Sequence, residues 1–206
     1  MSAYAAPIQV VQAALHRCGE ETIASLDEAS SAALIATSNY EGIVRANLTR
    51  HAWLFATETV NLTLVGPATS GDYVWAWAWP AEILNVRAVL VGGQRLRSMG
   101  YIVQGQQVFT RDLFTGSPVQ ITGTVRALEG AWPDDFAEAM VVRLQALFLE
   151  SLADKWSDAR IIKKDAEVLF QQAIVRDKRQ QPATTQEFNR LADVHRQRGS
   201  QSRYIG

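Results

Sequence analysis

The chain has 206 residues, 48% of them hydrophobic and 20% charged, a balance typical of a globular protein with a sizeable core rather than of a disordered chain. Cys18 is the single cysteine, which excludes an internal disulfide framework and a zinc site built on cysteines. The N-terminus lacks the positively charged segment of a signal peptide, and no apolar run approaches the roughly 20 residues of a membrane span. We therefore expect a protein that is cytoplasmic when it is made.

The formal net charge of -1 hides an uneven distribution. Residues 1–159 carry ten Lys and Arg against sixteen Asp and Glu, a net charge of -6. Residues 160–206 carry ten against five, a net charge of +5. An acidic body with a basic C-terminal end predicts that this end meets something acidic, or the body of another copy.

Residues 7–18 are predicted to form a helix, whose apolar face repeats at helical spacing: Ile8, Val11, Leu15 and Cys18. Proline suits the first turn of this helix, and Gly19 suits its end. Because Cys18 lies on the apolar face, we expect a buried, unreactive thiol.

A second helix is predicted from Ser25 to about His51, because Ser25 and Glu28 have the spacing of a capping box. Its apolar stripe begins with alanines: Ala29, Ala33, Ala36, Tyr40, Ile43 and Val44. Gly42 costs about 1 kcal/mol in a helix interior, so it either weakens the helix locally or marks a close contact.

From Thr57 to about Val125 the pattern predicts β-strands. Residues 66–71 are expected to form a loop with the glycine spacing of a phosphate loop. Asp72 and Tyr73 stand where that loop needs lysine and Ser or Thr, which excludes nucleotide binding.

Trp75, Trp77 and Trp79 alternate with alanines, which is the period of a strand that projects all three indoles from one face. Pro80 ends the regular pairing. Neither face of this strand is polar, so its own fold or another subunit must cover both sides. A packed core is the favoured interpretation; a stacking platform for carbohydrate or nucleic bases, and a protein interface, are the alternatives.

Helices return at Pro133, where Asp134, Asp135 and Glu138 fit the positive end of a helix dipole better than a catalytic acid–base pair. A short link near Trp156 leads to a further helix, which predicts an antiparallel helical hairpin. The apolar face of that helix comprises Ile162, Ala166, Leu169 and Ala173.

After about Lys178 the helical periodicity ends in a polar, basic segment. This segment is either a frayed terminus or an arm that orders on a partner. The arm would bind through three arginines, with an aromatic or an aliphatic residue as anchor: Arg196, Arg198, Arg203, Tyr204 and Ile205.

No catalytic or metal-binding motif is present, and His16, His51 and His195 lie far apart in the sequence. We predict no catalytic residues, no metal and no cofactor. The residues indicate an α+β fold, in which an antiparallel β domain interrupts a helical bundle body and an extended C-terminal arm follows. The expected divisions are residues 1–55 and 131–178 for the helical body, 56–130 for the β domain and 179–206 for the arm.

Five segments carry a resemblance to a known family through their order and spacing: residues 14–20 (ALHRCGE), 25–29 (SLDEA), 50–55 (RHAWLF), 79–86 (WPAEILNV) and 132–136 (WPDDF). In this order the chain resembles the tail tubular protein A family, the head-to-tail adaptors of short-tailed bacteriophages, over roughly residues 8–178. Glu82 and Asn85 stand near the places where that family usually carries an aspartate and a basic residue.

The resemblance implies a structural virion protein, located in the neck of the particle and not an enzyme. Such adaptors form a twelvefold ring, in which the helical body and the arm grip the portal and the β domain faces the tail nozzle. Genomic DNA passes through the lumen without specific binding, which an acidic wall suits. The three tryptophans would then brace the β domain on the helical body or on a neighbouring subunit.

Two other classes stay open. One is an adaptor of a long-tailed phage or of a gene transfer agent, which would share the helical body but join a different ring. The other is a ligand-binding module or enzyme, which would need a cleft near Trp75, Trp77 and Trp79.

Overall fold

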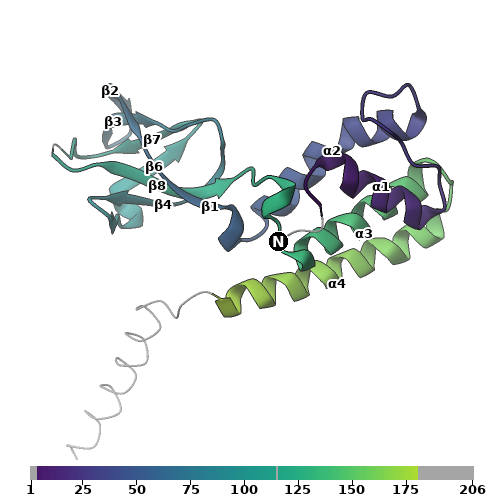
Figure 1. Ribbon diagram of the computed structural model, residues 1–206. Helices are drawn as coiled ribbons and strands as arrows, with labels where there is room; N and C mark the ends of the chain where they lie inside the picture. The colour runs from purple at the N-terminus through teal and green to yellow at the C-terminus, as the bar shows by residue number, and fades with distance from the viewer. Residues whose placement is uncertain (1–3, 115, 181–206) are drawn as a thin grey trace, which may run out of the picture.

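The computed structural model describes residues 4–114 and 116–180. They form a helical body and a β domain that lie next to each other along the length of the molecule (Figure 1). This is the α+β fold that the sequence predicts. The arm residues Arg196, Arg198, Arg203, Tyr204 and Ile205 lie outside the described residues.

The helical body contains four helices: α1 (Pro7–Cys18), α2 (Ser31–Thr49), α3 (Asp134–Ser151) and α4 (Trp156–Gln180). α3 is central and contacts each of the other three. It pairs with α4 as the predicted antiparallel hairpin. α1 ends as expected at Gly19, whose φ of 74° is left-handed and whose N–H closes onto the last turn.

The second helix starts six residues later than the sequence predicts. The helix is capped by Ser30, whose hydroxyl oxygen accepts from the Ala33 N–H at 3.2 Å. Ser25 and Glu28 instead close a turn in the connection from α1: the Glu28 carboxylate accepts from the Ala24 N–H at 2.9 Å. The capping-box pattern satisfies the donors of one turn, and that turn need not continue as a helix.

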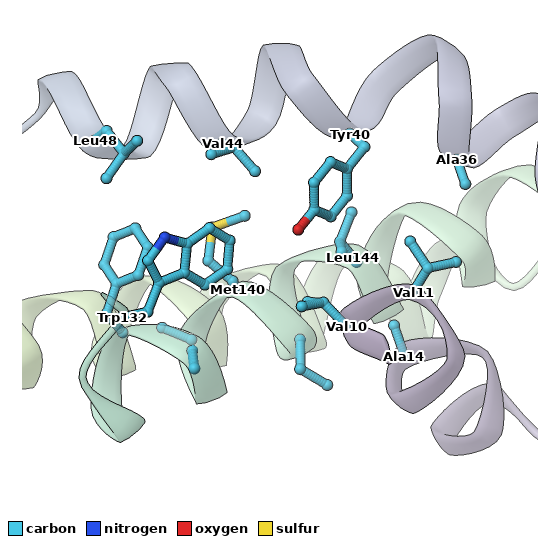
Figure 2. Packing of buried hydrophobic residues seen from close by; sticks show 14 of the residues in the cluster. Val10, Val11, Ala14, Ala36, Tyr40, Val44, Leu48, Trp132, Met140 and Leu144 are labelled. Atoms are coloured by element: carbon cyan, nitrogen blue, oxygen red, sulfur yellow. The ribbon is translucent and has the colours of Figure 1, made fainter. Parts of the chain in front are cut away.

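Gly42 does not mark a close contact among the described residues, because it is exposed and no atom lies within 4 Å of where its Cβ would stand. The predicted apolar stripe of the second helix, which begins with alanines, faces the core, except for exposed Ala29 and half-buried Ile43. Figure 2 shows its buried members on α2 facing α3 and α1 across the core. The labelled side chains are Ala36, Tyr40, Val44 and Leu48 on α2, opposite Trp132, Met140, Leu144, Val10, Val11 and Ala14.

The β domain has two four-stranded antiparallel sheets. The first has the order β1 (Thr57–Asn61), β8 (Val119–Val125), β4 (Ile83–Val91) and β5 (Gln94–Arg95). The second has the order β2 (Thr63–Ser70), β3 (Tyr73–Ala78), β7 (Gln107–Thr110) and β6 (Tyr101–Gln104). Side chains of both sheets, including Trp77, Val108, Val89 and Ile121, share one core, so the sheets pack as a sandwich.

The loop expected at residues 66–71 is mostly strand β2. Two register shifts, at Gly66 and after Pro67, let this strand pair with β3 despite the missing proline donor. An edge position makes this possible, because β2 is the outermost strand of its sheet. Only the turn at Gly71 (φ 62°) and Asp72 remains irregular.

Two hydrophobic cores divide the chain. Ala56 and Ala127 pack in the helical core, whereas Val60 and Val125 pack in the β core. The chain therefore passes from the helical body to the β domain between Ala56 and Val60, the first crossing, and comes back between Val125 and Ala127, the return crossing. No helix within residues 4–114 and 116–180 is long and apolar enough to cross a membrane.

Candidate interaction surfaces

The described part of the chain contains no group of three or more His, Cys, Asp or Glu side chains that could hold a metal ion. His16 is exposed on α1, and His51 lies between the two bodies. His195 falls outside the described residues. The histidines that the structure describes are therefore not gathered into one site.

The tryptophan strand is β3, and its central indole is a core residue. Trp77 is 7% exposed and packs against Val89 and Ile121 of the opposite sheet. Its Nε1 donates to the Thr110 hydroxyl at 2.9 Å. The packing partner of Trp77 is thus the first sheet of its own domain, rather than the helical body, and its ring faces are not free for stacking.

The other two indoles are half-buried. Trp79 packs against the edge of the β core. On the opposite face of β3, Ala76 is covered because it pairs directly with Phe109 of β7. Val74 and Ile102 on this face stay 43% and 39% exposed, so the second apolar face is only partly covered within one chain.

A buried carboxylate, Asp177 of α4, ties the helical body to the first crossing. One oxygen accepts from the Leu54 N–H at 3.1 Å, and the other lies 3.1 Å from His51 Nε2. The imidazole meets the Trp53 ring edge-on, with 5.0 Å between centroids. Both carboxylate oxygens therefore hold the chain that leaves α2, and they join α4 to this crossing.

Arg87 of β4 completes this junction from the side of the β domain. It donates to the backbone oxygens of Thr49 and His51 at 3.0 and 2.9 Å, and to the Thr124 hydroxyl at 3.1 Å. These two carbonyls lie at and just beyond the end of α2, where backbone oxygens lack helical partners. The guanidinium therefore joins a helix terminus to two strands.

A second polar cluster holds the return crossing, and its centre is Glu129, which is 2% exposed. Its carboxylate accepts from the Tyr40 hydroxyl at 3.0 Å and from Arg126 at 2.6 Å. Arg126 also pairs with Glu41 of α2 and lies over the Trp132 ring. Burial raises the pKa of the Tyr40 hydroxyl, and the Glu129 charge adds to that shift, so Tyr40 stays a neutral donor.

Both crossings are thus held by buried charges with their hydrogen bonds made. In the described residues, no buried side-chain nitrogen or oxygen lacks a partner. Breaking such a cluster leaves an uncompensated charge, which costs several kcal/mol. These clusters join the two crossings to α2 and α4, and Arg87 joins the β domain to the end of α2.

Two hollows of the described surface bear on the choice between a cleft and an interface. One of about 630 Å³ runs along α4 and has no described lining residue outside that helix, so it is an open strip. Another, beside Trp53 and Phe136 at the first crossing, is only about 20 Å³. Neither hollow is lined by Trp75, Trp77 or Trp79.

The chain matches no model of a known protein family and no curated protein. Two of the segments that carry the resemblance nevertheless converge in space. Trp53, from residues 50–55, and Phe136, from residues 132–136, are 5.0 Å apart between ring centroids. Glu82 and Asn85 are both exposed at the start of β4.

Sequence reasoning did not identify Asp177, Glu129 or Arg87. Their partners lie far away along the chain: Tyr40 is 89 residues from Glu129, and His51 is 126 residues from Asp177. No local pattern indicates such pairs.

Proposed function

We propose that this chain is a structural virion protein, the head-to-tail adaptor that forms a twelvefold ring between the portal and the tail nozzle. The observation that carries the proposal is the fixed placement of two unlike bodies, helical and β, one at each end of the molecule (Figure 1). A protein that joins two different partners along one axis needs two such ends. It also needs a firm junction, and the buried hydrogen bonds around Asp177 and Glu129 support this requirement.

The surface supports an assembling protein rather than an enzyme. Large apolar side chains are exposed at several places, including Leu34, Trp156 and Ile161 at 70%, 59% and 59%. Contiguous exposed apolar surface is typical of interaction sites. The acidic body also suits a channel wall, because carboxylates do not displace the counterions condensed on DNA and therefore do not hold it.

A ligand-binding module built on the tryptophans is the weaker candidate. Its central ring, Trp77, is 7% exposed and hydrogen-bonded to Thr110. A stacking platform needs open ring faces.

The test is reconstitution with candidate portal and nozzle proteins, followed by electron microscopy. The full chain should form rings of about 270 kDa, twelve times the 22.8 kDa monomer, on the portal. A variant lacking residues 186–206 should keep the helical signal and melting temperature of the full chain but lose portal binding. Unchanged portal binding by the shortened chain would refute the role of the arm, and the absence of binding by the full chain would refute the adaptor function. An adaptor of a long-tailed phage or gene transfer agent would bind a portal but not a nozzle.

A further inference from the structure

α4 carries two apolar stripes, each repeating every seven residues. Ala159, Ala166 and Ala173 are at most 4% exposed, and Ala173 packs in the helical core. Ile161, Val168 and Val175 are 59%, 55% and 50% exposed. Residues seven apart lie on nearly the same face of a helix. The second stripe, here called the outer strip, thus has the pattern of a helix–helix contact without a partner among the described residues.

The outer strip is bordered by positive charge. Among the exposed residues of α4, six Lys and Arg face three Asp and Glu. Glu167 and Arg176 pair with Arg50 and Asp135 of the same chain. Lys164 and Arg179 border the hollow along the strip and form no ion pair within the described residues. The strip is therefore apolar along its centre and basic at its margins.

A surface of opposite charge lies at the start of α2. No Lys, Arg or His occurs between Cys18 and Val44, a segment that contains five carboxylates. Four of them, Glu20, Glu21, Asp27 and Glu28, form no ion pair within the described residues. Leu34, 70% exposed, borders a hollow of about 450 Å³ together with Asp27 and Glu28. This acidic pocket combines an exposed apolar side chain with carboxylates, as the outer strip combines apolar side chains with basic ones.

The outer strip points away from the core of its own chain. α3 contacts both α2 and α4, and Ile161, Val168 and Val175 each lie two residues after a buried alanine, on the opposite side of α4. The start of α2, which borders the acidic pocket, and the first half of α4 lie at the same end of the helical body (Figure 1). Complementary patches at two different places on one molecule produce a head-to-tail contact, which closes into a ring when the rotation allows it.

We infer that the outer strip of one copy docks in the acidic pocket of the next, with Val168 against Leu34 and Lys164 beside Asp27. Charge argues against two other occupants. Two outer strips would place like charges together. The chain's own residues 181–206 carry four arginines against two carboxylates and would also meet a basic margin. The closure of this contact into twelve rests on the proposed adaptor function, whereas the contact itself does not.

The first test is cross-linking of the full chain in a Cys18→Ser background with a short bis-maleimide. A chain with both Val168→Cys and Leu34→Cys should yield a ladder of covalent oligomers beyond the dimer. Each single variant should stay monomeric on the gel, as should a Met99→Cys control on the β domain. Dimers from Val168→Cys alone would show that two outer strips meet, and monomers from the double variant would show no such contact; either result overturns the inference.

The second test is charge exchange. Lys164→Glu should weaken self-association at least about tenfold, because it places like charges together. Asp27→Lys in the same chain should restore most of the loss, which a folding defect would not do. Arg97→Glu on the β domain is the matched control and should change nothing. Failure of the second substitution to restore association would refute the pairing.

Two further outcomes separate the remaining possibilities. If Val168→Cys reacts with a maleimide only after residues 186–206 are removed, the arm covers the strip and the inference fails. A ladder without portal binding would keep the subunit contact and reject the adaptor function. Portal-bound rings without a ladder would support the adaptor function and reject this subunit contact.

Discussion

Replacing Phe136 by alanine should remove the centre of the helical core. The ring is 1% exposed and lies within 5.7 Å, between centroids, of four other aromatic rings: Trp53, Phe55, Trp132 and Phe170. These rings come from both crossings and from α4. The truncation therefore opens a cavity at the place where the two bodies join.

The expected cost follows from that environment. A buried Phe→Ala change costs about 3–5 kcal/mol, and each aromatic pair contributes about 0.5–1.5 kcal/mol beyond its buried area. With four pairs lost, we expect the upper end, about 5 kcal/mol. For a chain of this length that corresponds to a fall in melting temperature of about 10–20 °C.

The assay is denaturant-induced unfolding at one fixed protein concentration, because self-association would add to the apparent stability. Hydrogen exchange should show faster opening of α3 while β4 and β8 keep their protection, since the β core is a separate cluster. Met99→Ala, at a position 76% exposed, is the control and should change the free energy of unfolding by under about 0.5 kcal/mol. A loss below about 2 kcal/mol for the Phe136 variant would refute the reasoning.

Two further predictions concern the space around two glycines and the raised pKa of a thiol. Gly42→Ala should raise the free energy of unfolding by about 0.5–1 kcal/mol, because the site is helical and open, whereas Gly123→Ala should lower it by about 1–3 kcal/mol, because its Cβ would stand 2.8 Å from the Asn85 carbonyl oxygen. The same unfolding assay measures both variants, and equal changes in the free energy of unfolding would contradict the difference in space at the two glycines. Burial raises the pKa of the Cys18 thiol from 9.0 to about 11, so at pH 8 its reaction with a disulfide reagent should be roughly a hundredfold slower than in the unfolded chain. The protonated thiol contributes its full stabilisation below pH 9, and this contribution is lost as the pH rises towards 11. Labelling at pH 8 that is as fast as in the unfolded chain would contradict the raised pKa.

The sequence by itself determined the helices and strands whose signals are local. The stripe that begins at Ile8, the alternation of Trp75 and Trp77 and the charges after Pro133 each depend on residues a few positions apart, and the elements they predict are present. The stripe that begins at Ile8 also predicts a buried Cys18, whereas the structure leaves its side chain half-buried and raises the pKa of the thiol. Periodicity works here because each element must bury one face.

Only the tertiary structure decided where local signals compete. Ser25 and Ser30 both have cap chemistry, and the helix begins at the second, because the chain needs the residues between for its crossing from α1 to α2. The pairing of β1 with β8, which joins Thr57 to Thr124, closes the β domain across 67 residues and has no local signal. The same holds for the buried partners of Glu129 and Asp177.

α4 shows within one helix both what local sequence predicts and what only the tertiary structure reveals. The spacing of Ala166 and Ala173 indicates a packed face on α4, and both are buried. The equally regular stripe of Ile161, Val168 and Val175 is written in the same sequence, yet nothing local shows that it lacks a partner. Small alanines let α3 approach closely on one side, and the bulkier stripe is left facing away from the core. Exposure is a property of the whole packed chain, so only the tertiary structure could reveal this surface.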